Sequence, residues 1–153
     1  MKLTSWGNHP IIDAKVCAPK KDEISKLKFK GIARGLGRSY GDSALSTSVI
    51  KLTKLNKFIY FDSKEGLLHC ESGVSLGEIL EAYVQKGWFL FVTPGTKFVT
   101  LGGAIASDVH GKNHHIEGSF CDYVVSITLF VSGDFIECTR EVNADLFYAT
   151  CGG

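Results

Sequence analysis

Two glycine-rich segments hold the residues of this chain that are best suited to chemistry. The first reads ARGLGRSYGD from Ala33 to Asp42, and the second reads PGTKFVTLGGAIASDVHGKNHH from Pro94 to His115. Glycines such as Gly35, Gly37 and Gly41 let the backbone come close to a ligand, so that successive N–H groups can bind an anion. The two segments therefore predict a site for a long, phosphate-bearing cofactor.

Side chains in the first segment could complete such a site. Arg34 and Arg38 could neutralise phosphate charge, and Ser39 and Tyr40 add hydroxyl groups within the same short stretch. The alternative is a tight loop between strands with two solvated arginines. The convergence of glycines, arginines and hydroxyls favours the anion site over that alternative.

Two common phosphate-binding motifs are absent from the sequence. The G-x-G-x-x-G pattern fails because Tyr40 stands where the third glycine belongs. The P-loop pattern fails because Ala106 replaces its first glycine and Asn113 its Ser or Thr. Neither Rossmann nor P-loop chemistry is supported.

Three histidines follow the second glycine run. His110, His114 and His115 lie near Asp108 and Asp122 in the sequence, so a metal site has to be considered. Glycine and asparagine between the first two histidines favour a loop, and no further ligand spacing is persuasive, so we expect no metal. A histidine could serve as a general acid or base, but no Ser-His-Asp triad is recognisable, which makes a hydrolase a weak reading.

The composition disfavours several classes of function. Seventeen basic residues against sixteen acidic ones leave a net charge of +1, so no global field favours nucleic acid or a membrane surface. No apolar run is long enough for a signal peptide or a membrane span. The cysteines are odd in number and form no C-x-x-C pair, which favours reduced core thiols in a cytoplasmic protein. They are Cys17, Cys70, Cys121, Cys138 and Cys151.

The elements that must position these segments mix helices with short strands. The clearest helix begins after Ser75, where Glu78 completes a capping box, and closes at Gly87. Another is expected between the N-cap Asp22 and Gly31. Strands are expected at Val49–Leu52, Lys57–Phe61 and Leu67–Glu71, paired antiparallel, and at Tyr123–Val131 and Phe135–Cys138, joined as a hairpin. Trp88–Val92 is expected as a buried strand or extended segment, Gly102–Val109 as a turn or short helix, and Val142–Thr150 as a helix.

These elements do not alternate regularly as strand, helix, strand. A doubly wound Rossmann sheet is therefore disfavoured, and an α+β arrangement is expected. Because the composition is even along the chain, without a linker or a repeat, residues 1–153 are expected to form one folded unit.

Taken together, the two segments resemble the FAD-binding half of the vanillyl-alcohol oxidase and p-cresol methylhydroxylase flavoprotein superfamily. RGLGRSYGD, followed further along by PGT-x-x-VTLGGAIA-x-D-x-HGKNHH and GSF, carries the resemblance, which runs from about Trp6 to the end. It implies an α+β, p-cresol methylhydroxylase-type FAD-binding domain of two small α+β subdomains. Residues 1–153 would be its N-terminal part, with the second subdomain truncated and the substrate domain absent.

The resemblance implies a role for each glycine segment. The first would wrap the FAD diphosphate with its amides, and the second would line the flavin and its ribityl chain. Lys112, with His110, would be catalytic. The implied cofactor-binding residues are Ala33, Arg34, Gly35, Leu36, Gly37, Arg38, Ser39, Tyr40, Gly41, Asp42, Ser43, Gly95, Thr100, Leu101, Gly102, Gly103, Ser107, Asp108, Val109 and His110. Because covalently flavinylated members carry a histidine where this chain has Arg38, FAD is expected to be bound non-covalently.

The reaction implied by the resemblance is hydride transfer from a carbinol carbon to flavin N5. The most similar members oxidise the 2′-hydroxyl of a polyprenyl-phosphate ribose, the first half of an epimerisation towards a cell-wall arabinan precursor that a partner subunit would complete. Such a lipid-linked sugar would bring a cytoplasmic protein to the inner face of a membrane. Because the other domains are missing, we expect this chain alone not to turn over.

Two alternatives stay open. One is a non-catalytic flavin- or nucleotide-binding module, and the other is an oxidase of the same superfamily that acts on a free alditol or aldonolactone.

Overall fold

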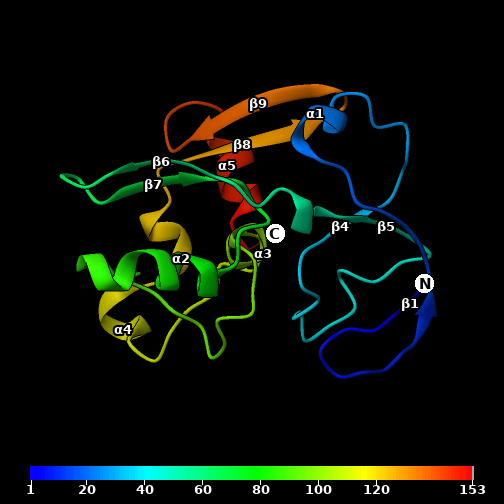
Figure 1. Cartoon of the computed structure of the whole chain (residues 1–153), viewed down its shortest axis with the longest axis horizontal. Helices are drawn as coiled ribbons and strands as arrows, with labels where there is room; N and C mark the ends of the chain where they lie inside the picture. The colour runs from blue at the N-terminus through cyan, green and yellow to red at the C-terminus, as the bar shows by residue number, and fades with distance from the viewer. Residues whose placement is uncertain (153) are drawn as a thin grey trace.

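The computed structural model describes residues 1–152 and shows helices and short strands mixed along the chain (Figure 1). The mixture agrees with the expected α+β class. The strands are β1 (Lys2–Leu3), β2 (Ile12–Asp13), β3 (Lys15–Cys17), β4 (Ile32–Arg34), β5 (Ser48–Lys51), β6 (Phe58–Asp62), β7 (Leu67–Cys70), β8 (Ser126–Val131) and β9 (Asp134–Thr139). The helices are α1 (Lys21–Ile24), α2 (Leu76–Tyr83), α3 (Leu101–Ala106), α4 (His114–Glu117) and α5 (Ala144–Thr150), with 3-10 turns at Leu52–Lys54, Val84–Lys86 and Phe120–Tyr123.

A parallel sheet in the order β3–β5–β4 carries the first glycine segment. The antiparallel pairing expected for Val49–Leu52 is wrong, because β5 runs parallel to both of its neighbours. Parallel neighbours need a crossover of about a dozen residues rather than a tight turn. Residues 35–47 are the crossover from β4 to β5, so the first glycine segment is a long connection held at both ends by one sheet.

The other three sheets of the described residues are antiparallel pairs of strands, and the first of them joins β1 to β2. β6 pairs with β7, and β8 pairs with β9 from Ser126↔Thr139 to Val131↔Asp134. Ser132 and Gly133 have φ angles of 54° and 102°, as a two-residue hairpin turn of the I′ type requires, which confirms the predicted hairpin. β8 begins at Ser126 rather than at Tyr123, since the preceding residues form a 3-10 turn.

The helix predicted after Ser75 is confirmed as α2. Glu78 N donates to Ser75 Oγ at 3.1 Å, and Glu78 Oε2 accepts from Ser75 N at 2.7 Å, so both halves of the capping box form. Its apolar face buries Leu76 and Ile79. Gly87, with φ +84°, ends the 3-10 turn that prolongs it.

The helix predicted between Asp22 and Gly31 is wrong in extent. α1 is a single turn, preceded by Lys20, whose N–H donates to Glu23 Oε2 at 2.7 Å. Beyond it, half-buried Leu27 and Phe29 alternate with exposed lysines. That period of two belongs to extended chain leading into β4 and not to a helix.

The main core lies between α2, α3 and the Phe120–Tyr123 turn. Because Ala104 and Ile105 belong to this core, packing fixes the position of the second glycine segment. Trp88–Val92 belongs to none of the helices or strands of the described residues. Its Phe89 and Phe91 are exposed, so the predicted burial holds for Val92 and fails for these two. The buried members of the core are Val74, Leu76, Ile79, Val92, Ala104, Ile105, Phe120 and Cys121.

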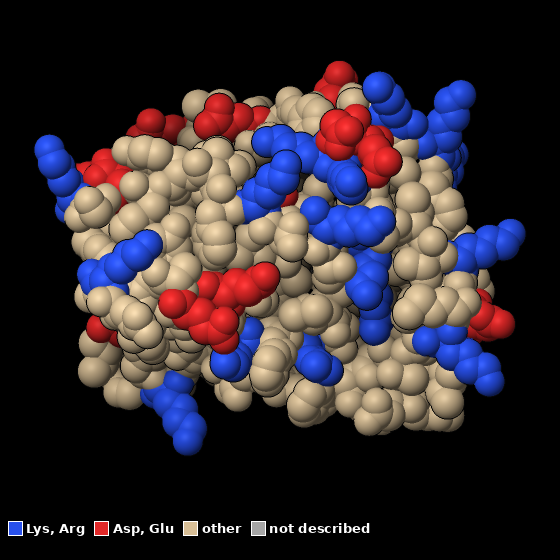
Figure 2. Space-filling model, viewed as in Figure 1, with Lys and Arg blue, Asp and Glu red and all other residues tan. Residues whose placement is uncertain are grey.

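The charged side chains, the cysteines and the helices can be compared with what the composition led us to expect. Figure 2 shows basic and acidic side chains interspersed over the viewed face, with much of that surface uncharged. All five cysteines are free thiols, and Cys121 and Cys138 are buried. In the part of the chain that the structure describes, no helix combines the length and the apolar character needed to cross a membrane.

Candidate cofactor site

Arg34 braces the first glycine loop from inside. Its Nη1 donates to Ala44 O at 2.9 Å, and its Nη2 donates to Thr4 O. Gly37 has φ +70°, and a Cβ there would overlap the Arg34 guanidinium, so glycine is needed for both conformation and space. Burial lowers the pKa of Arg34 from its ordinary value, yet a guanidinium stays charged at neutral pH. This cation therefore closes the loop by bridging its two ends.

The backbone amides of the loop have no internal partner. Within residues 1–152, no N–H from residue 36 to residue 42 donates a hydrogen bond to a carbonyl or a side chain. Carbonyls of the same stretch are engaged, since Ser39 O accepts from Trp6 N at 3.2 Å and Asp42 O accepts from Leu45 N at 2.8 Å. A loop with bonded carbonyls and free amides presents the positive ends of its peptide dipoles, which suits an anion.

Arg38 adds a cation that the fold itself leaves free. It is exposed and forms no hydrogen bond or ion pair with the described residues, but its Cζ lies 5.5 Å from the centre of the Trp6 ring. Leu36 and Tyr40, also in the loop, are exposed as well. Of the two predicted arginines, only Arg38 is thus available to an added ligand, while Arg34 is used within the protein.

The two glycine segments touch at Gly35 and Thr100. A Cβ on Gly35 would overlap Oγ1 of Thr100 and lie 3.1 Å from its Cγ2. Thr100 is only 3% exposed and is the N-cap of α3, where its Oγ1 accepts from Gly103 N at 3.1 Å. The tertiary structure therefore joins residues that are far apart in the sequence into one surface.

The amides at the start of α3, in contrast, are already used. Leu101 N donates to Val74 O at 2.7 Å, and Gly102 N donates to Ser72 O at 2.8 Å. With Gly103 N bonded to its cap, these three residues offer a close backbone surface but no free donor. Gly95 faces open space, since a Cβ there would have no atom within 4 Å.

The residues after α3 hold a turn together. Asp108, with φ +38°, accepts from Ser119 Oγ at 2.8 Å and from Cys121 N at 2.9 Å. Val109 N donates to Ala104 O at 3.0 Å, and exposed Ser107 is the C-cap of α3. Burial raises the pKa of the Cys121 thiol, with Cys151 and Asp108 adding to the effect. Asp108 is thereby engaged in holding the 119–121 turn.

The candidate catalytic side chains are exposed. His110 Nδ1 lies 3.4 Å from Gly111 O, and its ring packs edge-on to His114 with ring centres 5.1 Å apart. Lys112 is exposed, and its ammonium bonds to no described residue. Asn113 Nδ2 donates to Phe91 O at 3.0 Å, which ties this turn to the Trp88–Val92 segment. Among residues 1–152, no group of three or more His, Cys, Asp or Glu could hold a metal ion.

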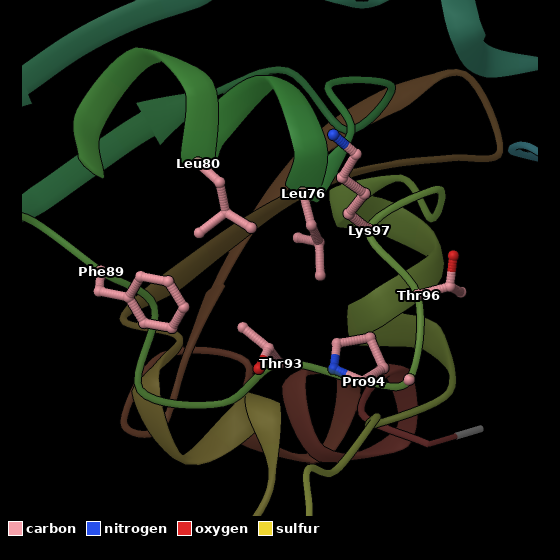
Figure 3. Close-up of a pocket in the computed structure, with 8 residues that line it drawn as sticks. Leu76, Leu80, Phe89, Thr93, Pro94, Thr96 and Lys97 are labelled. Atoms are coloured by element: carbon pink, nitrogen blue, oxygen red, sulfur yellow. The ribbon is translucent and has the colours of Figure 1, made fainter. Parts of the chain in front are cut away.

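A small open hollow lies elsewhere, between α2 and residues 89–97 (Figure 3). Leu76 and Leu80 reach into it from the helix, with Thr93 and Pro94 opposite. Its volume of about 220 Å³ is below the range of roughly 300–1,000 Å³ typical of ligand pockets. Among the predicted cofactor-binding residues only Gly95 lines it, so the hollow and the glycine-loop surface are separate features.

Sequence reasoning missed the segment Thr4–Trp6. Besides the bonds from Arg34 to Thr4 O and from Trp6 N to Ser39 O, Ser5 Oγ donates to Asp42 Oδ1 at 3.3 Å. The segment thus runs along the glycine loop. No motif announces it, because its bonds reach the loop mostly through backbone atoms that any sequence supplies.

The arrangement fits a dinucleotide with a diphosphate. Free consecutive amides and a free guanidinium are groups that bind diphosphates in proteins. The donor set comes from the first loop and the close backbone surface from α3. The roles that the resemblance implies, with the first segment at the diphosphate and the second along the flavin, stay a prediction.

Comparisons with known proteins agree with the geometry. The family described as FAD binding domain matches residues 22–139. The chain is 44% identical to decaprenylphosphoryl-beta-D-ribose oxidase of Mycolicibacterium smegmatis, covering 99% of this chain and 36% of that protein. It is 31% identical to L-gulonolactone oxidase of Scyliorhinus torazame, covering 76% of this chain and 27% of that protein. The chain therefore spans about a third of the length of these relatives.

Solved structures show the same fold. Carbohydrate oxidase from Microdochium nivale superposes with a TM-score of 0.77 over 90% of this chain and 32% of that chain, at 24% identity. Alkyldihydroxyacetonephosphate synthase superposes with a TM-score of 0.74 at 22% identity, again over 90% of this chain and over 28% of the other. By sequence and by fold, the chain belongs to the FAD-binding domain family of the vanillyl-alcohol oxidase and p-cresol methylhydroxylase flavoproteins, and its cofactor is FAD.

Proposed function

We propose that this chain is the diphosphate-holding part of an FAD-dependent oxidoreductase that oxidises a sugar hydroxyl, and that it binds FAD without a covalent bond. One observation carries the proposal. The amides of residues 36–42 have no partner among the described residues, although the carbonyls of Ser39 and Asp42 do. Because most residues of this loop are exposed, its free amides are open to a ligand.

Each part of the surface has a distinct role in this proposal. The amides of residues 36–42 bind the diphosphate oxygens, and Arg38 supplies the compensating charge. At the start of α3, the exposed Gly103 is the place where the cofactor lies against backbone. FAD, when bound, supplies the hydride acceptor.

The exposed Lys112 and His110 are the proposed catalytic groups. A lysine ammonium attracts an anionic or hydroxyl-bearing substrate, and an imidazole can take the hydroxyl proton at Nε2 while its Nδ1 faces Gly111 O. Asn113, bonded to Phe91 O, keeps the turn that carries both residues in place. The family resemblance implies that a substrate domain completes this site.

The substrate class rests on similarity. At 44% identity, the decaprenylphosphoryl-beta-D-ribose oxidase favours a lipid-linked sugar and oxidation of its hydroxyl. A partner subunit that completes an epimerisation is implied by the family resemblance alone. We place this work in the cytoplasm, at the face of a membrane that holds such a lipid. The 31% identity to L-gulonolactone oxidase supports a free aldonolactone as the second candidate substrate.

Titration with FAD tests the cofactor part of the proposal. We expect the flavin absorption bands of added FAD to shift in the presence of this chain, and Arg38→Ala to weaken binding by about tenfold or more, since hydrogen bonds to charged groups are worth about 1.5–3 kcal/mol. Lys64→Ala removes an equal charge from the exposed turn of the β6–β7 hairpin and is the control. Acid precipitation should release all flavin into the supernatant. Unchanged flavin bands, or flavin that stays with the precipitate, would contradict the proposal.

The substrate is tested on the full-length protein loaded with FAD. Anaerobic addition of a polyprenyl-phosphate ribose should bleach the flavin band, whereas an aldonolactone should leave it unchanged. The reverse pattern would favour the lactone oxidase. Bleaching by neither compound would reject both substrate classes.

A further inference from the structure

Trp6 is fixed to the first glycine loop, yet its ring is left open to solvent. Its N–H donates to Ser39 O at 3.2 Å, and the preceding Ser5 donates to Asp42 Oδ1 at 3.3 Å. Ser5 is 6% exposed, whereas Trp6 is 51% exposed. Bonds at Trp6 and at the residue before it thus hold this segment to the loop, while about half of Trp6 stays exposed to solvent.

An exposed and fixed tryptophan is unusual in energetic terms. Indole carries one of the largest apolar surfaces of any side chain, and its burial is normally what stabilises a folded structure. Here about half of that surface is unburied while the main chain has lost its freedom. The indole ring contacts the side chain of Arg38, whose Cζ is 5.5 Å from the ring centre.

This pair stands at the loop whose amides are free. Arg38 lies within residues 36–42, and Ser39, the residue that fixes Trp6, is its immediate neighbour. A flat apolar ring, a guanidinium and a row of free N–H groups therefore adjoin one another. Sites for nucleotides combine the same elements: cations and amides for phosphate, and aromatic rings on which planar groups stack.

We propose that Trp6 is a further binding residue of the cofactor site, on which a planar ring system of the dinucleotide stacks while the diphosphate occupies the amides of residues 36–42. The inference rests on the proposed FAD site and adds the Thr4–Trp6 segment to it. In this proposal Arg38 has two roles: it packs on the indole of Trp6, and its positive charge attracts the diphosphate.

The test compares two ligands that share a diphosphate. Wild type, Trp6→Ala, Trp6→Phe and Arg38→Ala are titrated with FAD and with inorganic diphosphate by calorimetry. We expect Trp6→Ala to weaken FAD binding by about five- to a hundredfold, as loss of one stacked base does, and to leave diphosphate binding within about twofold. Trp6→Phe should recover most of the FAD affinity because it keeps a ring, while Arg38→Ala should weaken both ligands.

The possible outcomes separate this inference from the proposed function. If FAD binds to wild type and Trp6→Ala leaves its affinity unchanged, the stacking role is refuted and the FAD site stands. Equal losses for FAD and diphosphate in Trp6→Ala would also refute stacking, because the residue would then act only by shaping the loop. If neither Trp6→Ala nor wild type binds FAD, both ideas fail. Far-ultraviolet circular dichroism shows whether each variant is folded. If Trp6→Ala does not fold, Trp6→Leu, which keeps an apolar side chain but no ring, is compared with Trp6→Phe in its place.

Discussion

Replacing Gly35 by alanine tests the contact that joins the two glycine segments. An added Cβ would overlap Thr100 Oγ1 and lie 3.1 Å from its Cγ2 and 3.3 Å from its Cβ. Thr100 is buried and caps α3, so it has little room to move away. Overpacking of this kind typically lowers stability by about 1–3 kcal/mol.

Thr100→Ala removes the obstructing atoms and also the cap. Loss of a threonine N-cap lowers stability by about 0.5–2 kcal/mol, here through the bond that Gly103 N donates to Oγ1. In the double variant the new Cβ of residue 35 fills space that the threonine side chain has left. We therefore expect the double variant to be more stable than the sum of the single effects predicts, by about 1 kcal/mol or more.

Urea unfolding followed by circular dichroism measures the free energies of unfolding of wild type, the two single variants and the double variant. Gly41→Ala is the matched control, since it lies in the same loop and a Cβ there meets no atom within 4 Å. We expect that control to change stability by less than about 0.5 kcal/mol. Strictly additive effects of the two substitutions would refute the reasoning, because they would mean that Gly35 and Thr100 do not touch.

Three further predictions concern the elements around the site. Ser75→Ala should lower stability by about 1 kcal/mol. Because bonds from Ser75 hold the pKa of Glu78 below its ordinary value, the difference between wild type and variant should be full above roughly pH 4.3 and shrink as the pH falls through the lower folded pKa, as urea unfolding at several pH values would show. Burial, with a smaller effect of Glu71, raises the pKa of Cys70 to about 11, so its alkylation by iodoacetamide should be slow at pH 8 and accelerate towards pH 11 in peptide mass spectra; fast labelling at pH 8 would contradict this. Asp108→Ala should destabilise the fold by about 2–3 kcal/mol in thermal unfolding, since it removes the acceptor of two hydrogen bonds, and a change within error would show that the 119–121 turn holds without it.

Elements with strong local signals were predictable from the sequence. α2 begins where Ser75 and Glu78 can satisfy each other's backbone amides, and the β8–β9 hairpin turns where Ser132 and Gly133 accept positive φ. In both cases the stabilising groups are close neighbours in the chain, so residue types and spacing are enough. The FAD-binding motifs are readable for the same reason.

Pairings between distant strands were not predictable in this way. β5 could form a hairpin with the following strand or join a parallel sheet, and its residues suit both. In the structure β5 pairs in parallel because it lies between β3 and β4, which come from distant parts of the chain. The length of α1 was missed because Ile24 and Leu27 fit a helix by spacing, whereas Leu27 and Phe29 are half-buried with the period of two of extended chain.

The sequence by itself determined the kind of site: glycines and arginines in one loop, small residues in another, and thus a dinucleotide cofactor. Only the tertiary structure decided which groups remain for that cofactor. It turned Arg34 inward onto two carbonyls, left Arg38 free beside Trp6, and used the amides of residues 101–103 while sparing those of residues 36–42. The physical reason is that a donor is available only if no carbonyl from a distant part of the chain accepts its hydrogen bond. The local spacing of residue types does not determine which distant groups come close in the folded protein.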